Sequence, residues 1–162
     1  FDGAPPNELR SSARTALALL TDNTSADAAA SGAVSTAELA ERLNALVRRP
    51  DWEREIRASA DSGTIPGAVA GALQDAAAEA MRNADRHAGS NAAKRITARI
   101  APTEISTSIC DDGAGFAPER LPHDRLGVRE SILHRMRAVQ GGRARVRSAP
   151  GTGTEVLLLW RA

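Results

Sequence analysis

The spacing of apolar residues along the chain predicts four amphipathic helices. They span residues 5–21, 36–48, 66–88 and 128–140. Ser35 and Glu38 form an S-x-x-E capping box that opens the second helix, and Gly89 suits the position just after the third. The small, polar residues 22–34 indicate a linker between the first two helices.

Short runs with the alternation of β-structure predict five strands. They span residues 53–59, 94–101, 104–110, 143–148 and 154–160. Pro102 and Thr103 join two of these strands as a tight hairpin, and a Pro-Gly-Thr-Gly turn joins the last two. Hairpin-joined strands favour an antiparallel or mixed sheet with helices on one face. We therefore expect an α+β two-layer sandwich with a mixed, mostly antiparallel sheet.

Composition limits the classes of protein to which the chain can belong. Its 162 residues suit one domain, and 42% hydrophobic residues suffice for a core. A net charge of +1 gives no electrostatic case for nucleic acid as a partner. The single cysteine, Cys110, rules out an internal disulfide and is expected in the core. No apolar stretch approaches the ~20 residues that a membrane-spanning helix needs. Because the chain begins with Phe1, we expect a fragment or a processed product of a parent protein that has room for membrane segments.

The longest predicted helix has three faces on a helical wheel. The apolar face carries Val69, Leu73, Ala77, Ala80, Met81 and Ala84. Roughly opposite, and expected to be solvated, are Asp75, Arg82 and Asp85. Between these two faces, within an arc of about 60°, lie Glu79, Asn83 and Arg86, with His87 at the apolar edge.

The intermediate face carries the chemistry that a magnesium-bound nucleotide requires. An amide oxygen such as that of Asn83 is a hard ligand for Mg²⁺, and the guanidinium of Arg86 pairs with phosphate. The carboxylate of Glu79 can orient a water molecule or a metal-bound group. A surface lattice of carboxylate–arginine pairs explains the same spacing, so this face alone does not decide the function.

Three glycine-containing segments follow the long helix. Residues 111–116, with the sequence DDGAGF, leave an apolar strand, so the carboxylate of Asp111 stands at a strand end beside bare backbone. Such a carboxylate can accept hydrogen bonds from the amino group of a purine. Residues 126–128 are expected to open the last helix, where an N-terminus favours phosphate, and residues 151–154 precede the last strand. Each segment taken alone is equally typical of an ordinary turn.

In this order, the four segments resemble the ATP-binding domain shared by histidine kinases, type II topoisomerases and 90-kDa heat-shock chaperones. The branch of histidine kinases with short lids is the most similar. Residues 79–88 look like its N box, and residues 111–116, 126–128 and 151–154 look like its glycine boxes. The resemblance covers roughly residues 50–162 and implies a Bergerat-type ATP-binding fold.

The resemblance also implies ATP and Mg²⁺ as cofactors. It assigns ATP binding to Asn83, Arg86, His87, Asp111, Gly113, Gly115, Arg125, Gly127, Val128, Gly153 and Thr154. Asn83 would hold Mg²⁺, and Glu79 would assist it as the second catalytic residue. Asp111 would bind the adenine amino group, with Thr154 supporting it through water. The glycines would let the backbone come close to the nucleotide.

Arg125 departs from the pattern of the resemblance. The second glycine box usually starts with another glycine, and Arg125 stands at that position. Either this guanidinium lies on the lid, at residues 117–126, and reaches phosphate, or the nucleotide affinity is reduced.

The resemblance divides the chain into residues 1–34, the trailing part of a dimerisation helix with a linker, and residues 35–162, the catalytic domain. It implies transfer of the γ-phosphate of ATP to a histidine on a separate dimerisation domain of a cytoplasmic or membrane-bound two-component kinase. The chain's own histidines are His87, His123 and His134. All lie in or after the N box, so we expect ATP binding with little or no autophosphorylation. The implied partners are the phosphoacceptor domain and a response regulator, and the full-length protein would be a homodimer.

Two alternatives keep the same ATP-binding domain. One is a serine kinase that acts on an anti-sigma-factor antagonist, which needs no dimerisation helices. The other is a non-catalytic nucleotide-binding module of a pseudokinase, for which Arg125 is the best support. The sequence disfavours a dinucleotide oxidoreductase, since no G-x-G-x-x-G joins a strand to a helix.

Overall fold

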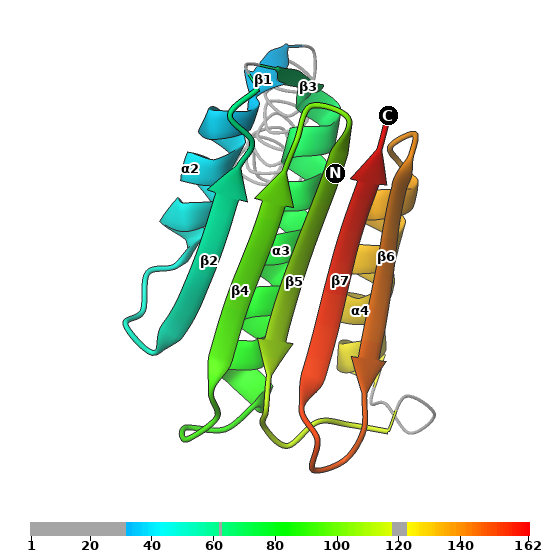
Figure 1. Cartoon of the computed structure of the whole chain (residues 1–162). Helices are drawn as coiled ribbons and strands as arrows, with labels where there is room; N and C mark the ends of the chain where they lie inside the picture. The colour runs from blue at the N-terminus through cyan, green and yellow to red at the C-terminus, as the bar shows by residue number, and fades with distance from the viewer. Residues whose placement is uncertain (1–31, 62, 118–122) are drawn as a thin grey trace, which may run out of the picture.

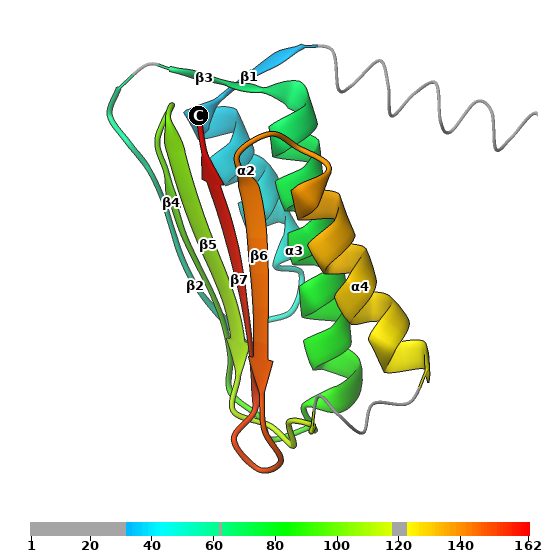
Figure 2. The same cartoon turned by 90° about the vertical axis from the view of Figure 1, so that its right-hand side faces the viewer.

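The described part of the chain folds into two layers, a five-stranded sheet and three helices that cover one of its faces (Figures 1 and 2). The computed structural model describes residues 32–61, 63–117 and 123–162, so the predicted helix at 5–21 lies outside the described residues. The elements are β1 (Ala33–Ser35), α2 (Thr36–Leu46), β2 (Trp52–Ala58), β3 (Thr64–Pro66), α3 (Gly67–His87), β4 (Lys94–Ile100), β5 (Glu104–Asp111), α4 (His123–Arg137), β6 (Gly142–Ser148) and β7 (Thr154–Arg161). The predicted fold class, an α+β sandwich with helices on one face, is confirmed.

The order of strands in the main sheet is β2-β4-β5-β7-β6. Strands β2 and β4 are parallel, because the chain crosses between them through α3, and all other neighbours are antiparallel. The register opposes Asp111, at the end of β5, to Lys94 on one side and to Thr154 on the other. These three residues from three strands therefore lie at one end of the sheet.

The core lies between the sheet and α3. Along β4 and β5 the inward residues are buried and alternate with outward residues, as a sheet with one open face requires. The apolar face of α3 is buried as predicted, with Leu73 and Ala77 fully inaccessible. Cys110, which was expected in the core, is only half-buried, because it alternates with the buried Ile109 and lies beside Ser108.

The long helix ends close to the position that its sequence predicts. Ala88 caps it, and Gly89 follows with φ of 103°, a conformation that glycine adopts at low cost. At its other end, the backbone N–H of Gly67 donates to the carbonyl of Gly32 at 2.6 Å. Among the described residues, no helix is long and apolar enough to span a bilayer.

The last helix begins five residues earlier than predicted, at His123 instead of residue 128. Residues 126–128 therefore lie inside α4, and the expectation that they open the helix is wrong. A glycine inside a helix costs about 1 kcal/mol relative to alanine, which is too little to stop a helix that is anchored further along. That anchor consists of the buried residues Ile132, Leu133 and Met136.

Strands β1 and β3 were not predicted. They form a two-stranded antiparallel sheet in which Ala33 pairs with Pro66 and Ser35 pairs with Thr64. Each has three residues, too few to give a period-2 pattern. Ser35 accepts a hydrogen bond from the backbone N–H of Glu38 at 3.0 Å, so half of the predicted capping box is present.

Candidate functional site

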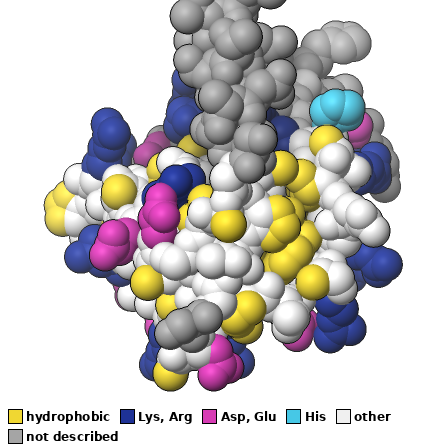
Figure 3. Space-filling model, turned by 90° about the horizontal axis from the view of Figure 1, so that it is seen from above, with side chains coloured by type: hydrophobic (Ala, Val, Ile, Leu, Met, Phe, Trp, Pro, Cys, Tyr) yellow, Lys and Arg dark blue, Asp and Glu magenta, His cyan; other side chains and the backbone are white. Residues whose placement is uncertain are grey.

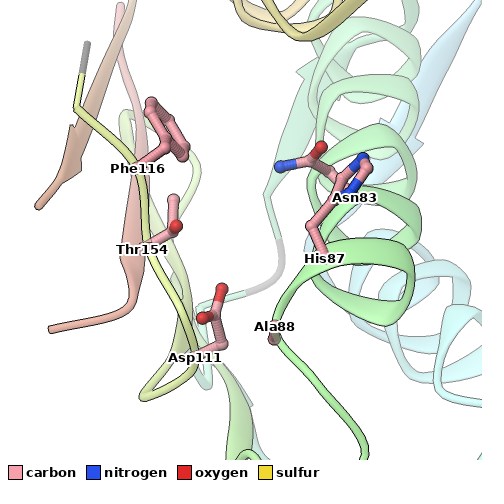
Figure 4. Close-up of a pocket in the computed structure, with 7 residues that line it drawn as sticks. Asn83, His87, Ala88, Asp111, Phe116 and Thr154 are labelled. Atoms are coloured by element: carbon pink, nitrogen blue, oxygen red, sulfur yellow. The ribbon is translucent and has the colours of Figure 1, made fainter. Parts of the chain in front are cut away.

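A small cavity lies where the end of α3 faces the adjoining ends of β5 and β7 (Figure 4). It is lined by Asn83, His87, Ala88, Asp111, Gly115, Phe116 and Thr154. The open space is about 10 Å³, which is room for about one water molecule. Two helical turns and two strand ends thus bring together side chains that are far apart in the sequence.

Asp111 supplies the carboxylate of the cavity. It is the last residue of β5, and its carboxylate points into the space enclosed by the labelled residues (Figure 4). One carboxylate oxygen, Oδ1, accepts a hydrogen bond from the backbone N–H of Gly113 at 3.0 Å. Burial raises the pKa of Asp111 above its ordinary value, although the backbone hydrogen bonds from Gly113 and Thr154 partly oppose this rise. The carboxylate is therefore only partly solvated and retains acceptor capacity on the cavity side.

A serine holds the hydroxyl of Thr154 in place. Ser148 Oγ donates to the carbonyl of Gly153 at 2.8 Å and lies 3.0 Å from Thr154 Oγ1. A hydroxyl carries one proton, so Thr154 must donate to Ser148 when Ser148 donates to Gly153. The lone pairs of Thr154 Oγ1 are then available as acceptors in the cavity. Ser148 also accepts from the backbone N–H of Phe116 at 2.9 Å, which ties the glycine-rich loop to the start of β7.

Asn83 and His87 form the opposite wall. They are four residues apart on α3 and so project from the same side of the helix. Figure 4 shows the amide of Asn83 extending from α3 toward the side of the cavity that carries Thr154 and Phe116, with the ring of His87 next to it. The amide of Asn83 and the carboxylate of Asp111 thus face one cavity from separate elements.

The glycines of the site bring segments of the protein's own backbone together. A Cβ atom on Gly113 would lie 2.1 Å from the carbonyl oxygen of Ala88, at the end of α3. On Gly153, with φ of 79°, it would lie 1.9 Å from the carbonyl oxygen of Asp111. Both positions therefore exclude any side chain. The sequence predicts that these glycines let backbone approach a nucleotide. In the structure they let two segments of the protein's own backbone approach each other.

Five of the predicted site residues line the cavity: Asn83, His87, Asp111, Gly115 and Thr154. Glu79 does not line it, and its carboxylate forms an ion pair with Arg82. Arg86 is exposed and also lies outside the cavity lining. The predicted intermediate face of α3 is thus divided, with Asn83 in the cavity, Glu79 paired with Arg82, and Arg86 exposed.

The residues around the second glycine box belong to α4. Gly127 is exposed, and nothing lies within 4 Å of the Cβ that it lacks. The side chains of Arg125 and Val128 fall outside the described part of the structure. Both alternatives for Arg125 therefore stay open.

Asp85, expected to be solvated, is instead half-buried and part of a polar cluster around the buried Lys94. Its Oδ1 accepts from Lys94 Nζ at 2.9 Å and from Trp52 Nε1 at 3.1 Å. Lys94 is 4% exposed and also donates to Asp51 Oδ2 at 3.0 Å. The hydrogen bonds that Lys94 donates to Asp85 and Asp51 raise the pKa of Lys94, and the bond from Lys94 lowers the pKa of Asp51. The helical wheel of α3 could not reveal this cluster because its partners come from other elements.

Three contributors to the site received no predicted role. Ala88 and Phe116 lie within segments that the resemblance singled out, so the sequence carried a signal for their place but not for their function. Ser148 lies outside those segments. Its only signal is that it stands shortly before a Pro-Gly turn, which does not distinguish a hydrogen-bonding centre from an ordinary strand end.

Comparison with known families identifies the class of the domain. Residues 68–162 match the model of the histidine kinase-, DNA gyrase B- and HSP90-like ATPases. The chain belongs to this family. The cavity between α3 and the ends of β5 and β7 is accordingly the candidate ATP site of a histidine kinase-like ATPase domain, since members of the family bind ATP.

Several solved histidine kinase structures share the fold of this ATPase domain. The histidine kinase domain of the blue-light activated kinase of Erythrobacter litoralis is 21% identical, with a TM-score of 0.56 over 83% of this chain and 67% of that chain. The catalytic domain of the histidine kinase ThkA is 14% identical, with a TM-score of 0.58 over 80% and 95%. The mycobacterial sensor histidine kinase MprB is 21% identical, with a TM-score of 0.53 over 81% and 97%. No curated protein sequence gives a significant match.

Proposed function

We propose that the chain binds Mg·ATP in the cavity between α3 and β5 and donates the γ-phosphate to a histidine on a separate dimerisation domain. One observation carries the proposal: the half-buried carboxylate of Asp111 and the amide of Asn83 line one cavity from opposite walls. The family of the chain and the fold that it shares with histidine kinase catalytic domains support it further.

The chemistry of the inner end of the cavity suits adenine. The carboxylate of Asp111 accepts from backbone N–H groups, and its two oxygens have about four lone-pair sites, so acceptor capacity remains for an exocyclic amino group. Thr154 offers its lone pairs beside it, directly or through one water molecule. His87 lines the same space and provides a flat ring beside the base or the ribose.

The chemistry of the outer part suits the metal and the phosphates. Asn83 offers a neutral oxygen ligand, which Mg²⁺ accepts together with phosphate oxygens. When bound, Mg²⁺ supplies the positive charge that neutralises the phosphate oxygens during transfer. Arg86, exposed one turn from Asn83, is placed to pair with phosphate. Glu79 can assist only after it leaves its ion pair with Arg82.

Nucleotide binding requires the cavity to widen. Its open space of about 10 Å³ admits about one water molecule, so a purine needs the walls to separate. Phe116 is the largest side chain of the β5–β7 wall, and it faces α3 across the cavity (Figure 4). We expect its rotation or displacement to accompany binding.

The acceptor histidine belongs to another domain. His87 lines the cavity, His134 is exposed on α4, and His123 begins that helix. A dimerisation domain of the same kinase therefore supplies the acceptor, and a response regulator receives the phosphate from it. The parent protein is proposed to be a homodimer whose catalytic domain lies in the cytoplasm.

Titration of a fluorescent ATP analogue, with and without Mg²⁺, tests the site. Asp111→Asn replaces an acceptor-only group with one that presents N–H donors, and we expect about a 10- to 100-fold loss of affinity, or about 1.5–3 kcal/mol. The matched control is Asp112→Asn, whose exposed carboxylate accepts from the backbone N–H of Ala93. Unchanged affinity of the Asp111 variant would rule out this site.

A second experiment tests the transfer. The chain is mixed with a dimerisation domain that carries the acceptor histidine, and labelled γ-phosphate is followed. Phosphohistidine on that domain supports the proposal. ATP binding without transfer favours a non-catalytic module, and transfer to a serine favours the alternative kinase class.

A further inference from the structure

The face of the sheet that lies away from the helices is rich in arginine. Its residues alternate along each strand with the residues that face the helices, and the register of the strands brings them side by side. Figure 2 shows α2, α3 and α4 all on the other side of the sheet. The basic residues of this open face are Arg57, Arg95, Arg99, Arg143, Arg145, Arg147 and Arg161. Its acidic residues are Glu53, Glu55, Glu104 and Glu155.

Every acidic residue of the open face pairs with an arginine of the same face. The pairs are Glu53 with Arg95, Glu55 with Arg57, Glu104 with Arg161 and Glu155 with Arg147. Within the described ranges, Arg99, Arg143 and Arg145 form no ion pair, and all three are exposed. The open face therefore carries uncompensated positive charge, although the net charge of the whole chain is only +1.

These three arginines stand on both sides of a strip of small and apolar side chains. The register opposes Leu159 of β7 to Arg143 of β6 on one side and to Ser106 of β5 on the other. Ser106 in turn opposes Arg99 of β4. The next row on this face consists of Arg145, Leu157 and Ser108. Leu159 is 36% exposed, and no other large hydrophobic side chain in the described part of the chain is exposed to that extent.

The strip has the dimensions of a helix-binding surface. Neighbouring strands are about 4.8 Å apart, so β4 and β6, which are separated by β5 and β7, are about 14 Å apart. An α-helix with its side chains is about 10–12 Å across. Leu157 and Leu159 are about 7 Å apart along β7, close to the spacing of about 6 Å between residues i and i+4 of a helix.

The strip is hollowed where β7 ends. A cavity of about 450 Å³ adjoins Leu159 there, and Arg143 and Arg161 belong to its lining. Figure 3 views this end of the molecule and shows Lys and Arg side chains around its periphery, with hydrophobic side chains between them. The cavity offers room for an apolar side chain next to two guanidinium groups.

We propose that this strip binds an acidic amphipathic helix of a partner protein. Apolar residues at i and i+4 of the partner helix pack on Leu157 and Leu159. Acidic residues on one flank of the helix pair with Arg99, and those on the other flank pair with Arg143 and Arg145. The inference goes beyond the proposed nucleotide site and does not depend on it.

The charge and the chemistry of the face argue against other occupants. A second copy of the chain, docked by the same face, would bring unpaired arginines together, and like charges at an interface are unfavourable. Nucleic acid gains its affinity from many phosphate contacts and from bases stacked on aromatic rings. Among the described residues, three arginines of this face are unpaired and no outward residue of the five strands is aromatic. An acidic helix uses both the arginines and the leucines.

Fluorescence anisotropy with a designed peptide tests the proposal. The probe is a fluorescein-labelled helical peptide of about 15 residues, with leucine at i and i+4 positions, glutamate on both flanks and alanine elsewhere. The control peptide has lysine in place of every glutamate and keeps the leucines. We expect the glutamate peptide to bind at least about tenfold more tightly than the lysine peptide, and its affinity to fall as salt is added.

Variants of the chain locate the binding surface. Arg143→Gln combined with Arg145→Gln should weaken binding of the glutamate peptide about tenfold. The matched control combines Arg48→Gln with Arg54→Gln, which removes two exposed arginines that lie off the open face and form no ion pair within the described ranges. Leu159→Thr keeps a residue suited to a strand and should weaken binding about threefold. Thermal unfolding shows whether each variant remains folded.

Several results would overturn the proposal. They are equal affinities for the two peptides, equal losses in the two double variants, and no saturable binding of the glutamate peptide up to about 1 mM. Saturable binding to vesicles that contain phosphatidylserine, with no binding of the glutamate peptide, would also overturn it and would assign the arginines to a lipid surface.

Discussion

The two sides of the end of α3 each hold a carboxylate, and their surroundings differ. On one side, Asp85 accepts hydrogen bonds from the ammonium of Lys94 and the indole of Trp52. On the other side, Asp111 accepts from backbone N–H groups and faces a cavity whose lining, among the described residues, holds no lysine or arginine. The first carboxylate is paired with an ammonium and an indole of the fold, whereas the second retains acceptor capacity for a ligand.

This difference shows how to separate structural from functional acids in one small region. The ammonium of Lys94 and the guanidinium of Arg49 together balance the charges of Asp51 and Asp85, so removal of Lys94 would leave the carboxylates undercompensated. Burial of Asp111 without such a partner raises its pKa, which is a cost to the folded state. A fold maintains that cost where binding benefits from a partly desolvated acceptor.

The largest expected effect is a loss of stability on disruption of the Lys94 cluster. Lys94→Met retains the apolar stem and removes the ammonium, which leaves two carboxylates without their main partner. We expect the free energy of unfolding to fall by about 2–3 kcal/mol, below the range for a fully buried pair because both acids are partly exposed. Urea denaturation measures this loss. The control is Arg95→Met, which removes an exposed pair with Glu53 and should cost about 0–1 kcal/mol. Equal losses in the two variants would contradict a structural role for the Lys94 cluster.

A smaller loss of stability is expected from a substitution beside the cavity that Asp111 lines. Ser148→Ala removes the hydroxyl that joins Phe116, Gly153 and Thr154. We expect a loss of stability of about 1–2 kcal/mol and weaker binding of the ATP analogue, because the orientation of Thr154 is no longer fixed. Thermal unfolding and nucleotide titration measure the two quantities. A variant that loses stability yet binds the analogue as well as the wild type would remove Ser148 from the site.

The smallest expected effect is a gain in stability, on substitution of Asp111. The pKa of Asp111 is raised in the folded state, so the folded state binds more protons than the unfolded state between the two pKa values. Its contribution to stability is therefore present at low pH and is lost as the pH rises through the raised pKa. Asp111→Asn removes this loss, and we expect the variant to be at least as stable as the wild type at pH 7. Denaturation curves at pH 3 and pH 7 test this, and a variant that is clearly less stable at pH 7 would contradict it.

The sequence predicts those features that depend on local periodicity. The long helix, its end at Gly89 and the hairpin at Pro102 and Thr103 all follow from spacing and turn chemistry, and the structure has them. Five of the predicted site residues share one cavity because their motifs stand at element ends that the sheet register aligns. Their roles in ATP binding stay predictions.

Other features depend on contacts that local patterns do not encode. The helical wheel places Asp85 toward solvent. In the structure Trp52 and Lys94 reach it from β2 and β4, and the pattern of α3 alone does not encode these contacts. The start of α4 was misplaced because Gly127 was given the weight of a boundary, whereas buried residues further along stabilise the helix. The small sheet of β1 and β3 was missed because three-residue strands carry no period.

The packing of Gly113 against the end of α3 restricts how the two walls can move. The N–H of Ala114 donates to the carbonyl of Ala88 at 3.1 Å, and Gly113 has no room for even a methyl group at this contact. The α3 wall and the β5–β7 wall are therefore held together at the end of the cavity where Ala88 contacts Gly113 and Ala114. We therefore expect the walls to separate at the other end, between Asn83 and Phe116, and we expect the proposed nucleotide to enter base first, with its phosphates toward the mouth.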